Sequence, residues 1–248
     1  MCGVHVPGDE ATAETLRDKR LVPTPNRHNC SGKHTGMLSY CQMSGRKYPD
    51  LPYIAFDHPI QQEILREFSE MCQVSPEQVC LGVDGCSAPN FAVPLRNAAL
   101  AFARLCDPQA GLGSPPERVA ACGQVTTAMQ AAPDMVAGPG KFDTLLMQAG
   151  GGKLVSKGGA EGYQAIGLMP GVWYPGSPAV GIALKIADGD GRGKARSAVV
   201  LEVLGQLNAL DVDELESLAE FGPRFSIFNW RMILVGLGRP VFELVYDK

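Results

Sequence analysis

Residues 154–157 (LVSK) open a series of three β-like runs that decides the fold, and residues 162–169 (GYQAIGLM) and 180–186 (VGIALKI) complete the series. Turns rich in glycine and proline separate the runs, as they separate consecutive antiparallel strands. A helix is predicted over residues 194–207, and residues 241–246 are predicted to form a final edge strand. The second half of the chain therefore predicts an antiparallel sheet with a covering helix.

The first half favours helices. Hydrophobic spacing predicts helices at residues 10–19, 32–44, 60–72, 95–105 and 119–129, a short helix around residues 145–147, and a short strand at residues 79–83. Helices followed by strands with a covering helix predict an α+β fold, an antiparallel sheet covered by helices, and not a βαβ array. We expect one domain over residues 1–248.

Composition excludes several classes of protein. The chain of 248 residues carries 22 Lys and Arg against 26 Asp and Glu, a net charge of −4 without a basic stripe, so nucleic acid is not an expected partner. It has no apolar run long enough for a membrane span and no signal peptide, which predicts a soluble cytoplasmic protein. Eight scattered cysteines without a CxxC pair are expected to be mostly reduced core residues.

The densest chemical cluster is residues 28–34 (HNCSGKH) at a predicted helix start. Unpaired backbone N–H groups and the helix dipole favour negative charge at such a position, where Ser31 could join a proton relay. The alternative is structural: Ser31 or Asn29 caps the helix and Cys30 is a core thiol. Spacing alone favours the cap.

A lysine stands near the end of a predicted strand. Lys157 is followed by Gly158 and Gly159, which let another backbone or a substrate approach closely, so its amine could hold a carboxylate or a developing negative charge. The alternative is a solvated lysine before a hairpin turn.

Asp84, Cys86 and Asp143 could coordinate a metal or hold a substrate ammonium group. The structural alternatives are that Asp84-Gly85 forms a turn and that Asp143 caps a helix. A Ser-x-x-Lys spacing from Ser44 to Lys47 is interpreted as chance.

Five blocks carry a family resemblance, in one order across nearly the whole chain: residues 28–37 (HNCSGKHTGM), 82–92 (GVDGCSAPNFA), 135–138 (MVAG), 157–162 (KGGAEG) and 181–185 (GIALK). With these blocks the chain resembles the type II asparaginase family typified by the rhizobial inducible enzyme. The resemblance implies hydrolysis of L-asparagine to L-aspartate and ammonia on a fold similar to serine β-lactamases and glutaminases. It also implies a serine–lysine pair, which we place at Ser31 and Lys157 and expect within hydrogen-bond reach.

The resemblance implies further site residues and partners. The expected substrate contacts are Asn29, Lys33, His34, Asp84, Gly158 and Glu161. The rhizobial zinc site includes two cysteines and a lysine; Cys86 matches the first cysteine, Asp143 stands where the second is expected, and the lysine finds no match around Ser87 to Pro89. The expected metal ligands are therefore Cys86 and Asp143, with zinc weakly held, and a homodimer is plausible from the family likeness.

One departure from the family separates the functional hypotheses. Family members carry an upstream segment with a Ser-x-x-Lys, the other of the family's two serine–lysine pairs. Here the Cys-Gly-Val-His block begins at Cys2, so we expect an N-terminally incomplete domain that lacks its first strands. The first hypothesis is an asparaginase-like amidohydrolase. The alternatives are an inactive or non-catalytic member that still binds amino acids, and a glutaminase-type serine hydrolase.

Overall fold

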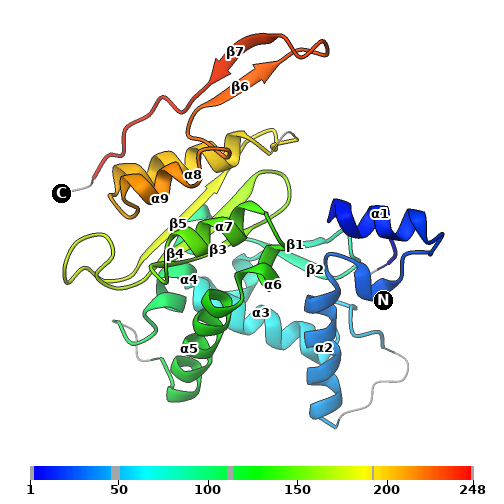
Figure 1. The fold of residues 1–248 in the computed structure, drawn as a ribbon. Coiled ribbons are helices and arrows are strands. Elements are labelled where there is room, and N and C mark those ends of the chain that lie inside the picture. Colours follow the sequence, from blue (N-terminus) through cyan, green and yellow to red (C-terminus); the bar gives the residue numbers. More distant parts are fainter. Residues whose placement is uncertain (1–2, 46–50, 111–113, 192, 247–248) are drawn as a thin grey trace. The chain divides into compact units, whose positions relative to one another are not determined.

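The computed structural model describes residues 3–45, 51–110, 114–191 and 193–246 (Figure 1). The chain divides into two compact units, Met1–Val93 and Pro94–Lys248, and each is described by itself. The single domain expected over residues 1–248 stays a prediction. Cys2 and Lys47 lie outside the described residues.

The first unit is mainly helical. Its elements are α1 (Glu10–Asp18), the 3-10 turn η1 (Pro25–Arg27), α2 (Ser31–Met43), α3 (Pro59–Cys72), the 3-10 turn η2 (Pro76–Gln78), β1 (Cys80–Val83) and β2 (Pro89–Ala92). The helices confirm the sequence predictions to within one residue at each end. Local chemistry explains two of the starts: the Asp9 carboxylate accepts a hydrogen bond from Thr12 N at 2.9 Å, and Pro59 occupies the first turn of α3.

A hairpin formed by β1 and β2 anchors the turn that carries Asp84. The strands pair antiparallel, and Asp84 N donates to Ala88 O at 2.8 Å across the turn. Cys86 and Ala88, both buried in this turn, pack with Met37 of α2 and Ile60 of α3. The sequence analysis missed β2, because the strand has only four residues, one of them a proline, and is too short to show a clear alternation of apolar and polar side chains.

The second unit combines helices with two antiparallel sheets. Its elements are α4 (Leu95–Cys106), α5 (Pro116–Ala131), α6 (Pro133–Ala137), α7 (Phe142–Ala149), β3 (Leu154–Gly158), β4 (Tyr163–Leu168), β5 (Val180–Lys185), α8 (Ala195–Gln206), α9 (Val212–Glu216), β6 (Phe225–Phe228) and β7 (Leu234–Gly238). The three consecutive strands and the helix after them confirm the pattern read from the sequence.

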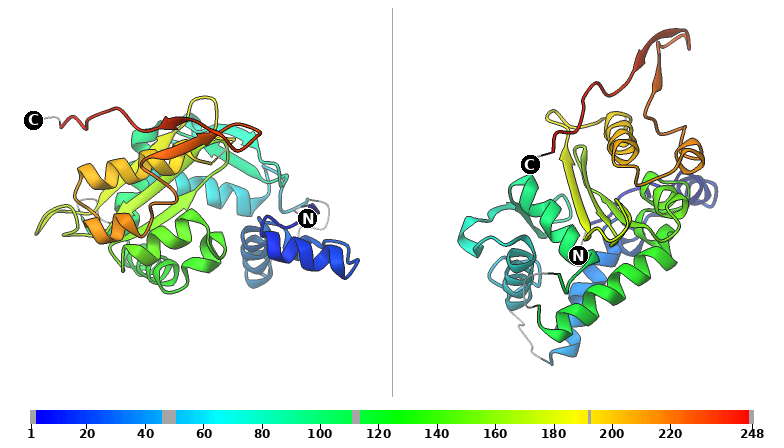
Figure 2. Two further views of the ribbon diagram at one scale, coloured as in Figure 1. Left: turned by 45° about the horizontal axis from the view of Figure 1, so that its top comes forward. Right: turned by 90° about the vertical axis from the view of Figure 1, so that its left-hand side faces the viewer.

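Strands β3, β4 and β5 form an antiparallel sheet in chain order, and helices cover both of its faces (Figure 2). One face packs against α4 at very short range, since a Cβ on Gly181 of β5 would lie 1.7 Å from Ala99 O. The strand alternation places Val155 and Lys157 on this face and Leu154, Ser156 and Gly158 on the other.

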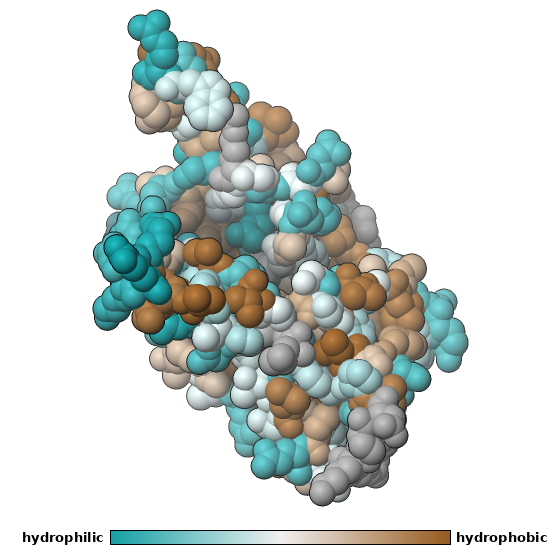
Figure 3. Space-filling view, turned by 90° about the vertical axis from the view of Figure 1, so that its right-hand side faces the viewer, coloured by the Kyte–Doolittle hydropathy of each residue, from teal (hydrophilic) through white to brown (hydrophobic). Residues whose placement is uncertain are grey.

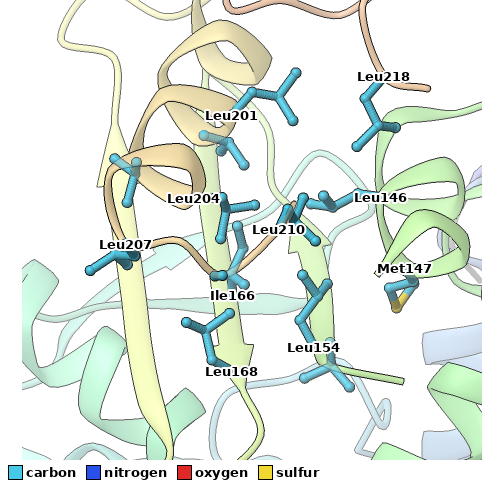
Figure 4. Close-up of a cluster of buried hydrophobic side chains, with 14 of the residues drawn as sticks. Leu146, Met147, Leu154, Ile166, Leu168, Leu201, Leu204, Leu207, Leu210 and Leu218 are labelled. Atoms are coloured by element: carbon cyan, nitrogen blue, oxygen red, sulfur yellow. The ribbon is translucent and has the colours of Figure 1, made fainter. Parts of the chain in front are cut away.

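The opposite face of the sheet holds the main hydrophobic core. Leucines of α8 meet Leu154, Ile166 and Leu168 of β3 and β4, with Leu146 of α7 beside them (Figure 4). These strand residues and Leu204 of α8 are fully buried. Burying a leucine side chain stabilises a protein by roughly 1.5–3 kcal/mol, so these leucines contribute substantially to the stability of the unit. This packing also fixes β3, the strand that carries Lys157.

The last part of the chain differs from the prediction. Residues 241–246 form no strand in the described structure; the strands are β6 and β7, which form a hairpin, and the sequence analysis missed both (Figure 1). Pro240 lacks the N–H that a strand needs, so pairing ends at Gly238. The chain beyond it is held by α8 instead: Gln206 Nε2 donates to Phe242 O at 2.9 Å and Leu244 N donates to Gln206 Oε1 at 2.8 Å.

Among the described residues, the distribution of apolar and polar side chains on the surface does not mark a binding site. Apolar and polar residues are interspersed over the face shown in Figure 3. The most exposed large apolar side chain is Trp230, between β6 and β7. In the part of the chain that the structure describes, no helix has the length and apolar character needed to cross a membrane.

Candidate functional site

The start of α2 presents the serine that the sequence analysis singled out. Ser31 is the first residue of the helix and is half-buried, and its hydroxyl has no hydrogen-bond partner among the described residues. Cys30 stands at the N-cap position without a side-chain cap, so the predicted capping by Ser31 or Asn29 is wrong. The ring nitrogen His28 Nδ1 accepts from Cys30 N at 3.0 Å, and Asn29 Oδ1 instead meets His5 Nε2 at 2.9 Å. Within the described part of the chain, the Ser31 hydroxyl therefore makes no hydrogen bond that holds the fold.

Lys33, in the first turn of α2, forms an ion pair with Asp84. Lys33 Nζ donates to Asp84 Oδ2 at 2.9 Å, and both side chains remain more than a third exposed. The hydrogen bond from Lys33 lowers the pKa of Asp84, against the opposing effect of burial. Burial opposes the charge on Lys33, but Asp84 and Cys86 outweigh it and raise the pKa of Lys33. A cation and an anion are thus held side by side near Ser31.

Two thiols and the same carboxylate form a cluster. One ligand atom from each of Cys30, Asp84 and Cys86 can be chosen so that all three lie within 4.8 Å of one another, and Cys86 Sγ donates to Asp84 Oδ2 at 3.6 Å. Thiolate and carboxylate groups are ligands that zinc accepts, so the donor set fits a zinc ion. Burial, followed by the neighbouring Cys86, raises the pKa of the Cys30 thiol. Binding of a metal here would therefore release protons.

The expected ligand pair is distributed differently. Cys86 lies with Cys30 and Asp84 in the first unit, whereas Asp143 belongs to α7 of the second unit. The pairing of Cys86 with Asp143 stays a prediction. Cys30 is a candidate that sequence reasoning interpreted as a core thiol, although it stands inside the motif of residues 28–34. The sequence does not reveal Cys30 as a ligand because its neighbours Asp84 and Cys86 come from a turn more than fifty residues away.

His34 forms a second polar contact of α2. It is buried, and its Nδ1 lies 2.8 Å from the Tyr53 hydroxyl with the two rings edge to face. Its Nε2 is buried without a partner among the described residues. Burial, followed by the charge of Lys33, lowers the pKa of His34. The sequence analysis named His34 as a substrate contact but missed Tyr53, which stands in a proline-rich connector without a motif.

The second unit presents Lys157 at the end of β3. Lys157 is exposed, and its amine donates to Gly158 O. Gly158 N in turn donates to Asp143 Oδ2 at 2.7 Å. Glu161 has a left-handed backbone conformation with φ +56, and its carbonyl accepts from Lys185 Nζ. The exposure of Lys157 fits both readings of this lysine, a solvated residue and a group that meets a substrate.

Asp143 does not cap a helix. Lys141 is the N-cap residue of α7, and Asp143 lies in the first turn with its carboxylate directed to β3 and β4. It accepts hydrogen bonds from Ser156 Oγ and Gln164 Nε2. The predicted cap is wrong because α7 begins two residues earlier than an Asp143 cap would require.

The structure brings together some of the predicted residues. Lys33 and Asp84 form one group with Cys30 and Cys86, and Gly158 and Asp143 are joined by a hydrogen bond. Ser31 belongs to the first unit and Lys157 to the second, so their hydrogen bond stays a prediction.

Comparison with known proteins identifies the family. The model of the L-asparaginase II family matches residues 1–239, which include every candidate residue named above. No curated protein matches the chain in a sequence search. The family match confirms the resemblance drawn from the five blocks and agrees with the α+β fold. The chain therefore belongs to the L-asparaginase II family, a family of asparaginase-like amidohydrolases whose substrate is a small molecule, an amino acid.

Proposed function

We propose that this chain hydrolyses the side-chain amide of L-asparagine, giving L-aspartate and ammonia by serine–lysine catalysis. The Lys33–Asp84 ion pair supports this proposal together with the Ser31 hydroxyl in the same helical turn, which has no partner among the residues that the structure describes. A free amino acid is a zwitterion, and this pair offers a cation for its α-carboxylate and an anion for its α-ammonium group. Asn29 and His34, on either side of Ser31 and Lys33, are further expected contacts, as are Gly158 and Glu161 of the second unit.

The chemistry assigns two roles to the proposed pair. The neutral amine of Lys157 accepts the Ser31 hydroxyl proton while the serine oxygen attacks the amide carbonyl carbon. The same proton then passes to the leaving nitrogen, and ammonia departs. Water hydrolyses the resulting ester to release aspartate and restore the serine. Such a relay requires the two groups within roughly 2.6–3.2 Å in the reacting complex.

The residues also fit a zinc ion. Cys30, Asp84 and Cys86 would hold it, and bound zinc polarises a carbonyl or lowers the pKa of a bound water. Thiolates bind zinc more tightly than carboxylates, so we expect both cysteines to matter more than Asp84.

Ammonia release by the purified chain, with L-asparagine and L-glutamine as parallel substrates, tests the function. We expect activity on asparagine that Ser31→Ala lowers by at least ~100-fold, the low end of a proton-transfer contribution. Ser44→Ala is the matched control, because Ser44 follows the last turn of the same helix and its hydroxyl donates to Cys41 O. Equal activity of Ser31→Ala and Ser44→Ala would exclude Ser31 as the nucleophile. A preference for glutamine would favour the glutaminase-type alternative.

A further inference from the structure

A buried polar network lies behind the strand that carries Lys157. Asp143 Oδ1 accepts from Ser156 Oγ and from Gln164 Nε2, both at 2.6 Å, and Gln164 Nε2 also lies 2.8 Å from Ser156 Oγ. Asp143 Oδ2 accepts from Gly158 N at 2.7 Å. One carboxylate therefore joins α7 to the ends of β3 and β4.

Burial shows that this network serves the fold of the strand and not contact with a substrate. Ser156 and Gln164 are fully buried, and Asp143 is 5 % exposed. A buried carboxylate is costly unless it is hydrogen-bonded, and here both oxygens are used. One of the two oxygens, Oδ2, accepts from a backbone N–H of β3, which ties the Asp143 side chain to the position of that backbone.

Gly158 is the residue through which this constraint reaches Lys157. Its N–H is held by Asp143, and its carbonyl accepts from the Lys157 amine. A Cβ on Gly158 would lie 2.6 Å from Arg196 Nη1 and 3.0 Å from Asp143 Oδ2, so the glycine is closely enclosed on that side. Lys157 itself points to the other face of the sheet and is exposed.

We propose that Asp143 is a positioning residue for Lys157: by holding Gly158 N, it fixes the carbonyl that holds the lysine amine. The value of this positioning for catalysis rests on the proposed role of Lys157 as proton acceptor, whereas the positioning itself does not. Ser156 and Gln164 support the carboxylate, and Asp143 acts on Lys157 only through Gly158.

Two variants separate this role from simple stabilisation. Asp143→Ala removes the acceptor of Gly158 N, whereas Ser156→Ala removes a buried hydroxyl of the same network and leaves that acceptor in place. Hydrogen exchange at Gly158 N and acetylation of individual lysines by acetic anhydride are read out by NMR and mass spectrometry. Lys185 is the internal reference, because its amine also donates to backbone carbonyls but is not joined to Asp143.

We expect Asp143→Ala to speed exchange at Gly158 N by at least ~10-fold, since a hydrogen bond to a charged acceptor is lost. Acetylation of Lys157 should change by about two- to tenfold relative to Lys185, the range of one net hydrogen bond. Ser156→Ala should leave both rates within about twofold of the parent protein, well below those changes. If Asp143→Ala fails to fold, Asp143→Asn, which keeps the volume and removes the charge, should show the same changes with smaller size.

An unchanged acetylation ratio of Lys157 to Lys185 in a folded Asp143 variant would overturn the proposal, as would equal effects of the Asp143 and Ser156 variants. Ammonia release is measured on the same samples. A changed acetylation ratio in a protein that does not hydrolyse asparagine supports the positioning and counts against the proposed function. Loss of activity without a change in the ratio overturns the positioning alone.

Discussion

Gly181 allows the closest approach between a helix and the main sheet, which makes Gly181→Ala a demanding test of the fold. The residue lies in β5 opposite Gly167, on the face that packs against α4. An added Cβ would lie 1.7 Å from Ala99 O, 2.5 Å from Ala99 C and 2.9 Å from Ala103 N. All three are backbone atoms, so no side-chain rotation relieves the overlap.

The size of the overlap sets the expected loss of stability. Ordinary van der Waals contact begins at 3.4 Å, twice the distance to Ala99 O, so α4 must move away from β5 or the strand must bend. Either change separates Phe102 and Leu105 of α4 from the core against which they pack. Overpacking by a methyl group costs ~1–3 kcal/mol when side chains can adjust, and we expect ~3 kcal/mol or more here because backbone must move.

The matched control is Gly123→Ala. Gly123 lies within α5, and nothing is within 4 Å of the Cβ that the substitution adds. Alanine is favoured over glycine inside a helix, so we expect a gain of ~0.5–1 kcal/mol. Urea unfolding followed by circular dichroism measures both variants. Gly181→Ala within ~0.5 kcal/mol of the parent protein, the range of a neutral surface substitution, would refute the close approach of α4 to β5.

Three further predictions concern the first unit. Asp84→Asn should lower the free energy of unfolding at neutral pH by at most ~1 kcal/mol, because the pair with Lys33 is part-exposed. Since the pKa of Asp84 is lowered in the folded protein, this contribution is lost as the pH falls through the folded-state pKa. Urea titrations in which parent protein and variant differ by a constant free energy down to acid pH would contradict this prediction. His34 has a lowered pKa, so its contribution is present above pH ~6.5 and is lost as the pH falls; melting temperatures between pH 7 and 5 should fall more steeply for the parent protein than for His34→Gln. When the variants are purified without chelator, Cys30→Ala and Cys86→Ala should contain less bound zinc than the parent protein, whereas Cys122→Ala, which removes a buried thiol outside the cluster, should keep it. Zinc retained in both cluster variants would exclude this site.

The fold was predictable where hydrophobic period and turn residues agree. Helix α3 and strands β3 to β5 combine a clear apolar pattern with glycine or proline near their ends. Helix α2 has no such pattern, because its buried residues are His34 and Met37 while Leu38 is exposed. The hairpin β6–β7 was missed because most of its large apolar residues are exposed, so its pattern does not mark a buried face. The segment 241–246 has the apolar composition of a strand, but Pro240 and the α8 side chain Gln206 determine its course.

The candidate site was predictable only where its chemistry is local. Ser31 and Lys33 stand in one motif, and the sequence predicts the helix start that carries them. The partners of this motif are brought by long-range folding: Asp84 and Cys86 come from the turn between β1 and β2, and Tyr53 comes from a connector. Asp143 shows the reverse error, because a local rule for helix caps was applied to a residue whose role is set by contacts with β3 and β4.

The exposure of the Lys33–Asp84 pair fits the binding of a zwitterion. A salt bridge between part-exposed side chains is worth only ~0–1 kcal/mol, so a substrate that inserts its carboxylate and ammonium groups between the two gives up little when the pair opens. The substrate then forms two charge-assisted contacts in place of one. A fully buried pair would cost far more to separate, since each ion would lose its partner away from water. The shifted pKa values act in the same direction: with that of Asp84 lowered and that of Lys33 raised, both groups stay charged at neutral pH, so the pair is ready for an amino acid without a change of protonation.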